Sequence, residues 1–186
     1  MDTVVLDDFV SDEFLYMVNQ FFNELTWNYQ NQANRNHFGN GTHRFFGANF
    51  YPYPDVVGDG FWDDQVKNKG WMSFLWEAVS SHLNITGKVQ EIHANLQVQG
   101  QDGSWHKDSY SGDTIALIYF AVMRWRTEWG GCLNIKENIN NSEEYNSYEY
   151  IPGRIIVFDG QKEHRGLGPT EPNKGRISLV YNIAKE

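Results

Sequence analysis

The spacing of apolar residues changes along the chain, from a helical period in its first half to a strand period in its second. Residues 12–25 carry an apolar stripe at helical spacing, and Ser11 precedes this stripe as a suitable N-terminal cap. A second helix is predicted over about 62–83. Residues 26–60 show no clean period and predict loops, with one strand at 44–50. The first half of the chain is therefore expected to supply two helices that pack on something flat.

The second half has the pattern of short strands. Residues 88–98 alternate between apolar and polar, and residues 114–123 are a candidate for a buried strand. Glycine-rich turns separate further short strands, predicted at 132–136, 149–151, 154–158 and 176–183. Two helices followed by seven or eight strands predict a mainly β (α+β) fold. We expect a β-sandwich or jelly roll with the helices packed on one outer face.

No internal repeat, low-complexity stretch or linker interrupts the chain, so a single domain spanning 1–186 is expected. Its helical N-terminal part covers 1–86 and its β core covers 87–186. A chain of 186 residues is long enough for one sizeable hydrophobic core. The 12 Phe, 10 Tyr and 7 Trp residues are too many for a disordered chain.

Charge and cysteine content exclude several classes of protein. The net charge of −9 argues against a protein that follows nucleic-acid phosphates. A single cysteine, Cys132, excludes both an internal disulfide and a thiolate zinc cluster. The N-terminus lacks the pattern of a secretory signal, and the longest apolar run, 115–123, is far short of the ~20 residues that span a bilayer. A cytoplasmic protein without nucleic-acid or membrane partners is expected.

The tripeptide His106-Lys107-Asp108 is the first candidate for chemistry. Alternate residues of a strand face the same way, so His106 and Asp108 would present an imidazole and a carboxylate side by side to one metal ion. Three residues match such a pattern often by chance. Taken alone, the tripeptide is better explained as a His–Asp pair on the surface.

Two later residues favour a metal site. His164 follows a predicted strand and turn, far enough along the chain for returning strands to bring it back to Asp108. Two histidines and one carboxylate on one face of an octahedral metal are typical of non-haem Fe(II) oxygenases. Arg176 opens the last predicted strand, and Ser178 points the same way. A buried arginine needs an anion, which a dicarboxylate co-substrate or a structural ion pair would equally provide.

Six segments in this order resemble 2-oxoglutarate/Fe(II)-dependent oxygenases of the prolyl 4-hydroxylase-like branch. They cover most of the chain and are VLDDFV at 5–10, WHKD at 105–108, GGCL at 130–133, PGRIIVF at 152–158, HRGLGP at 164–169 and RISL at 176–179. Each segment is unspecific, but the ordered combination is highly specific. Collagen-type members usually carry lysine at the position of Arg176, so the exact subfamily stays open.

The resemblance implies a double-stranded β-helix, the jelly-roll or cupin-like barrel, with iron held at its open end by His106, Asp108 and His164. The residues implied for 2-oxoglutarate are Arg176 and Ser178 at its distal carboxylate, Leu133 in the pocket wall and Tyr119 as a hydroxyl donor. Phe120 aligns about as well as Tyr119. Asn95 and Gln97, on the preceding strand, are further candidates for facing the pocket.

The function that the resemblance implies is hydroxylation of an unactivated C–H bond. The implied cofactor is Fe(II), the implied co-substrates are 2-oxoglutarate and O2, and ascorbate is a candidate accessory reductant. Succinate and CO2 would be the co-products. A prolyl residue in a peptide or protein is the leading substrate, and a small molecule is the first alternative. A cupin-like metal dioxygenase that uses no keto acid and a non-catalytic jelly-roll binding module are the others.

Overall fold

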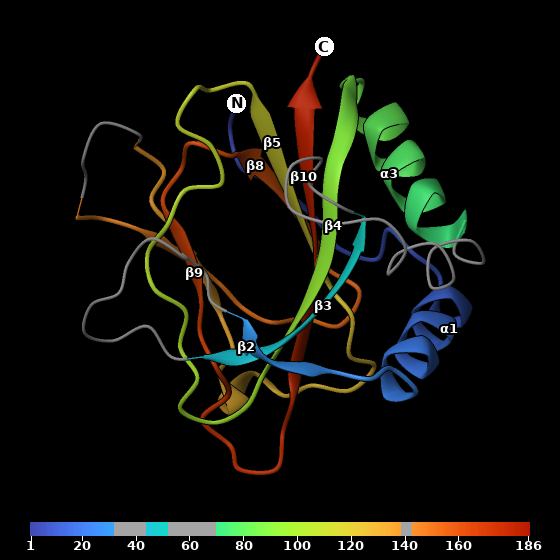
Figure 1. The fold of residues 1–186 in the computed structure, drawn as a ribbon, viewed down its shortest axis with the longest axis vertical. Helices are drawn as coiled ribbons and strands as arrows, with labels where there is room; N and C mark the ends of the chain where they lie inside the picture. The colour runs from blue at the N-terminus through green and yellow to red at the C-terminus, as the bar shows by residue number, and fades with distance from the viewer. Residues whose placement is uncertain (32–43, 52–69, 139–142) are drawn as a thin grey trace.

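Two antiparallel sheets face each other, and two helices cover the outer side of the larger sheet (Figure 1). The computed structural model describes residues 1–31, 44–51, 70–138 and 143–186. The strand order is β1-β8-β5-β10-β4-β3-β2 in the larger sheet and β7-β6-β9 in the smaller one. This is the predicted jelly-roll architecture with helices on one face.

The elements of the larger sheet are β1 (Val4–Leu6), β2 (Asn28–Asn31), β3 (Phe45–Tyr51), β4 (Gly87–Gln97), β5 (Thr114–Phe120), β8 (Ile155–Asp159) and β10 (Arg176–Lys185). Those of the smaller sheet are β6 (Leu133–Ile135), β7 (Asn146–Tyr148) and β9 (His164–Gly166). The helices in the described part of the chain are α1 (Asp12–Asn23), α3 (Gly70–Leu83) and the short 3-10 helix η1 (Thr127–Trp129). Neither α-helix in the described ranges has the length and apolar character needed to cross a bilayer.

The outer core lies between the larger sheet and the helices. Ser11 caps α1 by accepting a hydrogen bond from the Phe14 amide, and Val18 and Phe22 of that helix are fully buried. They belong to one apolar cluster with residues of α3 and with every second residue of the central strands, such as Leu117 and Leu179. Burial of this continuous apolar surface is the main force that holds the helices on the sheet.

The inner core lies between the two sheets. It contains Ile118 and Phe120 of β5, Phe158 of β8, and Leu133 and Ile135 of β6. These positions alternate with the outer-core positions along the same strands, because successive side chains of a strand point to opposite faces. The sheet is therefore apolar on both faces at β5 and β8, which explains why these strands read as continuous apolar runs.

One predicted strand is wrong, and four observed strands, β1, β2, β7 and β9, were not predicted. Residues 149–151 lie outside any strand; β7 precedes them at Asn146–Tyr148, and the apolar character of Tyr150 reflects a buried side chain in irregular backbone. The strands β1, β2 and β9 have only three or four residues each, too few to show a period. The predicted helix over 62–83 is observed as α3 from Gly70, and 62–69 lie outside the described residues.

Candidate metal centre

His106 and His164 are held side by side by backbone pairing. The His106 amide donates to the His164 carbonyl at 3.1 Å, and the His164 amide donates to the His106 carbonyl at 2.9 Å. This pair is an isolated bridge between β9 and the loop before β5, so the expected strand around the His-x-Asp tripeptide is reduced to one residue. Asp108 lies in a bend instead, and its amide donates to the Gly160 carbonyl at 3.0 Å.

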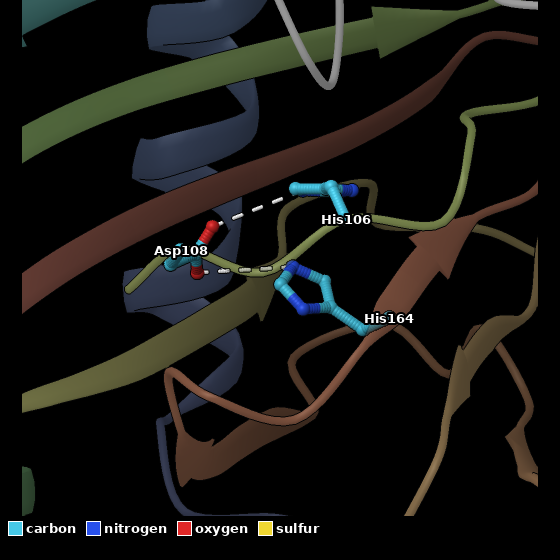
Figure 2. A group of neighbouring side chains, drawn as sticks. All are labelled: His106, Asp108 and His164. Atoms are coloured by element: carbon cyan, nitrogen blue, oxygen red, sulfur yellow. Dashed lines mark ion pairs between the residues drawn. The ribbon is translucent and has the colours of Figure 1, made fainter. Parts of the chain in front are cut away.

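Three side chains converge at this bridge (Figure 2). The Nε2 atom of His106 lies 3.8 Å from one carboxylate oxygen of Asp108, and Nε2 of His164 lies 3.7 Å from the other. All three candidate ligand atoms lie within 4.8 Å of one another. These separations are too long for hydrogen bonds and leave room for an ion between the atoms. The structure thus brings together the three residues that the sequence suggested.

Backbone carbonyls determine which ring nitrogen of each histidine is available to a metal. Nδ1 of His106 lies 2.9 Å from the Ser104 carbonyl, and Nδ1 of His164 lies 3.1 Å from the Lys162 carbonyl. A carbonyl oxygen only accepts, so each Nδ1 carries a hydrogen and each Nε2 of the neutral ring keeps its lone pair. In both histidines Nε2 is also the ring nitrogen that lies near the Asp108 carboxylate, so all three side chains could ligate one ion.

The electrostatics of the site favour the neutral form of His106. Burial, reinforced by the neighbouring His164, lowers the pKa of His106 to about 4. His106 is therefore neutral at pH 7 and able to ligate a metal. The Oδ2 atom of Asp108 is buried and accepts no hydrogen bond from any residue that the structure describes. A divalent cation would supply the partner that this oxygen lacks.

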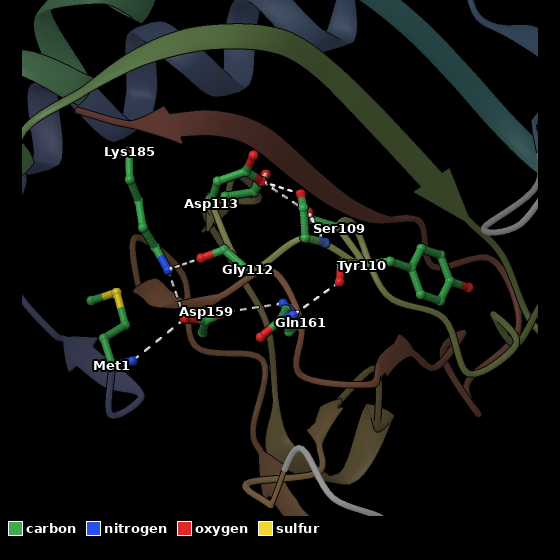
Figure 3. A network of polar contacts seen from close by, with 10 residues as sticks. Met1, Ser109, Tyr110, Gly112, Asp113, Asp159, Gln161 and Lys185 are labelled. Atoms are coloured by element: carbon green, nitrogen blue, oxygen red, sulfur yellow. Dashed lines mark hydrogen bonds and ion pairs between the residues drawn. The ribbon is translucent and has the colours of Figure 1, made fainter.

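The loop that follows Asp108 is tied to the ends of two strands (Figure 3). Gln161 donates to the Tyr110 carbonyl at 3.1 Å, and the Lys185 ammonium donates to the Gly112 carbonyl at 2.7 Å and to Asp159 at 2.8 Å. These contacts join the loop to the end of β8 and to β10. The Tyr110 ring is 77% exposed and points away from the network. These contacts hold the loop that carries the Asp108 carboxylate in place.

Arg176 is buried at the start of β10 and is only 2% exposed. Its Nε donates to the Gly131 carbonyl at 2.8 Å, and its Nη1 donates to Gln97 at 2.8 Å and to Ser178 at 3.1 Å. Burial lowers the pKa of Arg176 to about 10, so the guanidinium stays charged at neutral pH. No carboxylate among the described residues forms an ion pair with it. The structural ion pair considered for Arg176 is thus not formed within the described chain.

Two glycines make room for the guanidinium. A Cβ atom on Gly166 would lie 3.1 Å from Nη1 of Arg176, and one on Gly131 would lie 3.4 Å from its Cδ and 3.0 Å from the Trp125 ring. Gly131 also has a φ of +80°, which side chains rarely adopt. The glycine-rich segment before Leu133 therefore has a packing role, because it lets Arg176 lie close to the backbone of the smaller sheet.

The aromatic residue that faces Arg176 is Phe120, not Tyr119. The guanidinium carbon lies 5.3 Å from the centre of the Phe120 ring and 5.5 Å from that of Tyr150. Tyr119 points to the opposite face of β5, where it packs edge-on to Phe14 of α1. The expected role of Tyr119 at the co-substrate is therefore corrected, and the reason is the alternation of side chains along β5.

Sequence reasoning missed Tyr150, which stacks on Phe120 with 4.4 Å between ring centres. Its hydroxyl donates to the Ile177 carbonyl and accepts from the Val122 amide. Burial raises the pKa of Tyr150 above its usual range, so the phenol is neutral. The signal in the sequence is the apolar character of this position, which predicts a strand at 149–151. Leu133, in contrast, lies in the same inner cluster as Phe120, and its role in a pocket wall stays a prediction.

The inner face of the larger sheet is apolar along β5 and polar along β4. The register of β4 and β10 places Gln97 opposite Arg176, so both point to the inner side. The same side of β4 continues with Asn95, His93 and Glu91. Nδ1 of His93 lies 3.2 Å from a carboxylate oxygen of Glu91. Along β5 this face is apolar and belongs to the inner core. A ligand between the sheets would therefore meet a polar wall on one side and an apolar wall on the other.

Comparisons with known proteins identify the fold. No family model and no curated protein matches the sequence. Among solved structures, a prolyl hydroxylase from Trichoplax adhaerens, in complex with a peptide of the hypoxia inducible factor, matches with a TM-score of 0.68. The identity is 13%, over 99% of this chain and 84% of that one. The chain has the fold of the 2-oxoglutarate-dependent non-haem oxygenases.

Two further structures support this assignment of the oxygenase fold. A prolyl-4-hydroxylase from Pseudomonas putida matches with a TM-score of 0.61 at 15% identity, over 100% of this chain and 93% of that one. SnoK, a non-haem α-ketoglutarate-dependent carbocyclase of nogalamycin biosynthesis, matches with a TM-score of 0.68 at 6% identity, over 99% of this chain and 79% of that one. The predicted double-stranded β-helix is thus confirmed, and identities this low speak for the fold alone.

Proposed function

We propose that the protein is a 2-oxoglutarate- and Fe(II)-dependent hydroxylase. The observation that carries the proposal is the pairing of two incomplete sites on one oxygenase fold. One is a His-Asp-His cluster whose carboxylate oxygen lacks a hydrogen-bond donor among the described residues. The other is a buried guanidinium whose acceptors are all uncharged. A cation completes the first site and an anion the second.

The donor set suits iron. Nε2 of His106, a carboxylate oxygen of Asp108 and Nε2 of His164 would hold Fe(II) on one face and leave its other positions open. Bound iron would supply the oxidative chemistry, in which 2-oxoglutarate and O2 yield succinate, CO2 and a hydroxylated C–H bond, and ascorbate would help keep the metal reduced. The protein's own residues position these reactants and exclude water.

Arg176 would bind the distal carboxylate of 2-oxoglutarate. Its Nη2 atom donates to no residue that the structure describes, which leaves two N–H groups for a ligand. Ser178 would assist by fixing Nη1. Phe120 and Leu133 would form the apolar wall beside the carbon chain of the co-substrate and keep water from the charged pair.

The leading substrate is a prolyl residue in a peptide or protein. The two prolyl hydroxylases with the same fold support this choice, one of them in complex with a peptide. The polar wall along β4, with Asn95 and His93 on its inner side, offers hydrogen-bonding groups of the kind that a peptide backbone uses. A small-molecule substrate is the alternative, favoured by the equally good structural match to SnoK.

The co-substrate proposal is tested by anaerobic titration with Fe(II) and 2-oxoglutarate. The wild-type protein should develop a visible metal-to-ligand charge-transfer band, and His106→Ala should lose it because the metal loses a ligand. Arg176→Ala should keep metal binding but lose 2-oxoglutarate binding. Absence of the band in the wild type would point to a binding module. A band or turnover that is unaffected in Arg176→Ala would point to a metal dioxygenase that needs no keto acid.

The substrate proposal needs a separate assay. Proline-containing peptides and a set of small hydrophobic metabolites should be incubated with the iron-loaded enzyme, 2-oxoglutarate and ascorbate. Succinate formation coupled to the gain of one oxygen atom by a peptide, located at a prolyl residue by fragmentation, is the expected result. Coupled turnover with small molecules alone would replace the peptide by the alternative substrate class.

A further inference from the structure

Gln97 joins the guanidinium of Arg176 to the strand that carries a metal ligand. Its Oε1 accepts from Nη1 of Arg176 at 2.8 Å. Its Nε2 donates to the Gly166 carbonyl at 3.0 Å and to the Gln101 carbonyl at 2.6 Å. Gly166 ends β9, the strand that begins with His164. Gln97 is itself only 3% exposed, so these contacts are not shared with bulk water.

The contacts leave one orientation for the Gln97 amide. A guanidinium only donates, so it must face the amide oxygen, and the two carbonyls only accept, so they must face the amide nitrogen. A flipped amide would place a donor against Arg176 and an acceptor against both carbonyls. Gln97 therefore presents its oxygen to Arg176 in a fixed direction.

The neutrality of this acceptor matters as much as its direction. The three acceptors of Arg176 are the Gly131 carbonyl, the Ser178 hydroxyl and the Gln97 amide, and none carries a charge. A glutamate of the same shape would form a buried ion pair with the guanidinium and cancel its charge. With glutamine, Arg176 is oriented and keeps a full positive charge for a ligand.

The contacts also define the direction from which an anion is bound. A guanidinium has five N–H donors, one on Nε and two on each Nη. The described residues accept three of them, one from Nε and two from Nη1, so the two on Nη2 remain. The hydrogen bonds from Nε to the Gly131 carbonyl and from Nη1 to the Gln97 amide oxygen fix the plane of the guanidinium. Nη2 is thus held in one place, and its two donors remain for a ligand.

We propose that Gln97 is a positioning residue that orients Arg176 without neutralising it, and that it thereby selects a dicarboxylate 2-oxo acid over a monocarboxylate one. This inference rests on the proposed function. The distal carboxylate of the dicarboxylate would meet the charge that Gln97 preserves. A monocarboxylate such as pyruvate has no group that reaches Arg176, so Gln97 would not affect its binding.

The test compares 2-oxoglutarate and pyruvate on the Fe(II)-loaded protein, by anaerobic titration of the charge-transfer band. Wild type should prefer 2-oxoglutarate strongly. Gln97→Glu should weaken 2-oxoglutarate binding by about tenfold or more and change pyruvate binding by less than about twofold. Gln97→Met, which removes the orienting contact but keeps the charge, should lower the ratio of the two affinities less, by about threefold.

The ratio separates positioning from a general structural role. A loss of local structure would weaken both ligands alike and leave their ratio at the wild-type value. That result in Gln97→Met, or in both variants, overturns the inference. Fe(II) affinity, measured separately, should stay unchanged, and if Gln97→Glu does not fold, the ratio in Gln97→Met decides. Failure of the wild type to bind 2-oxoglutarate would overturn the proposed function itself, a distinguishable outcome.

Discussion

Single backbone carbonyls orient the two histidines of the candidate metal centre. The Ser104 and Lys162 carbonyls hold Nδ1 of the two histidines, and burial keeps His106 neutral far below its ordinary titration range. Each carbonyl lies two residues before the ring that it contacts, so these two contacts depend on the local course of the backbone. The burial of His106 depends on the folded chain around it. At the residue scale, the sequence suggests which residues are candidate ligands, whereas the local fold decides the tautomers of the two histidines.

The metal-free protein should lose stability in acid because of His106. Its pKa is about 4 in the folded state and 6.5 in the reference state, so between these values only the unfolded chain binds the proton. Stability is fully present above pH 6.5 and falls as the pH drops toward 4, by up to about 3 kcal/mol. Urea denaturation at pH 7.5, 6, 5 and 4 measures this slope.

The matched control is His106→Gln, which cannot take up the proton. The difference in unfolding free energy between wild type and variant should shrink or reverse as the pH falls, because only the wild type carries this titration. A difference that is constant over the whole range would contradict the buried, neutral state of His106.

At the scale of the element, β5 shows what a strand pattern leaves open. Its seven residues are all buried, so the sequence predicts a strand but not which residues face the helices. Tyr119 and Phe120 are neighbours with opposite directions, and only the packing of α1 on one side and β6 on the other distinguishes them. A shift of one residue would exchange their roles.

Tyr119→Phe tests this assignment. The Tyr119 hydroxyl is buried and has no hydrogen-bond partner among the described residues, so its removal should stabilise the protein by up to about 1 kcal/mol. The affinity for 2-oxoglutarate should not change. Urea denaturation and titration of the charge-transfer band measure the two quantities.

The matched control is Tyr150→Phe, on the side of the sheet that faces Arg176. Its hydroxyl bonds to the Ile177 carbonyl and the Val122 amide, so its loss should cost about 1–2 kcal/mol. A weakened affinity for 2-oxoglutarate in Tyr119→Phe would show that the Tyr119 hydroxyl reaches the co-substrate after all.

At the scale of the whole molecule, a buried lysine joins segments that are far apart in the chain. Lys162 is 4% exposed and pairs with Glu137, which also accepts from Thr3 and Tyr148. The cluster connects the N-terminal segment, the smaller sheet and the turn before His164. Because the Lys162 carbonyl also holds Nδ1 of His164, the packing of the smaller sheet and the geometry of the metal site are linked.

Glu137→Gln should therefore destabilise the fold by about 2 kcal/mol, because it leaves the buried Lys162 ammonium without a carboxylate. The control is Glu163→Gln, which breaks the more exposed pair with Lys136 and should cost less than about 1 kcal/mol. Both values come from urea denaturation. Restoration of stability by Lys162→Met in the Glu137→Gln background would support the ion-pair mechanism, and equal costs for the two single variants would contradict it.

The sequence by itself determined the elements that are long enough to show a period, and it identified the candidate side chains of the site. The sequence shows the apolar stripe of α1, the alternation of β4 and the buried run of β5. Each pattern lies within one continuous segment, so it can be recognised without knowledge of the rest of the fold. His106, Asp108, His164 and Arg176 were found because their residue types, order and neighbouring segments resemble a known family. The short strands β1, β2, β7 and β9 were not found, because three or four residues form a strand only when a partner strand binds them.

The tertiary structure alone decided how these groups face one another. It turned Phe120 rather than Tyr119 toward Arg176, added Tyr150 from irregular backbone, and gave Arg176 three neutral acceptors and no carboxylate within the described chain. These facts depend on contacts between residues that are tens of positions apart, such as Gln97 and Arg176. Periodicity reports which side of an element is buried, but only the packing of the sheets and helices determines what lies on that side.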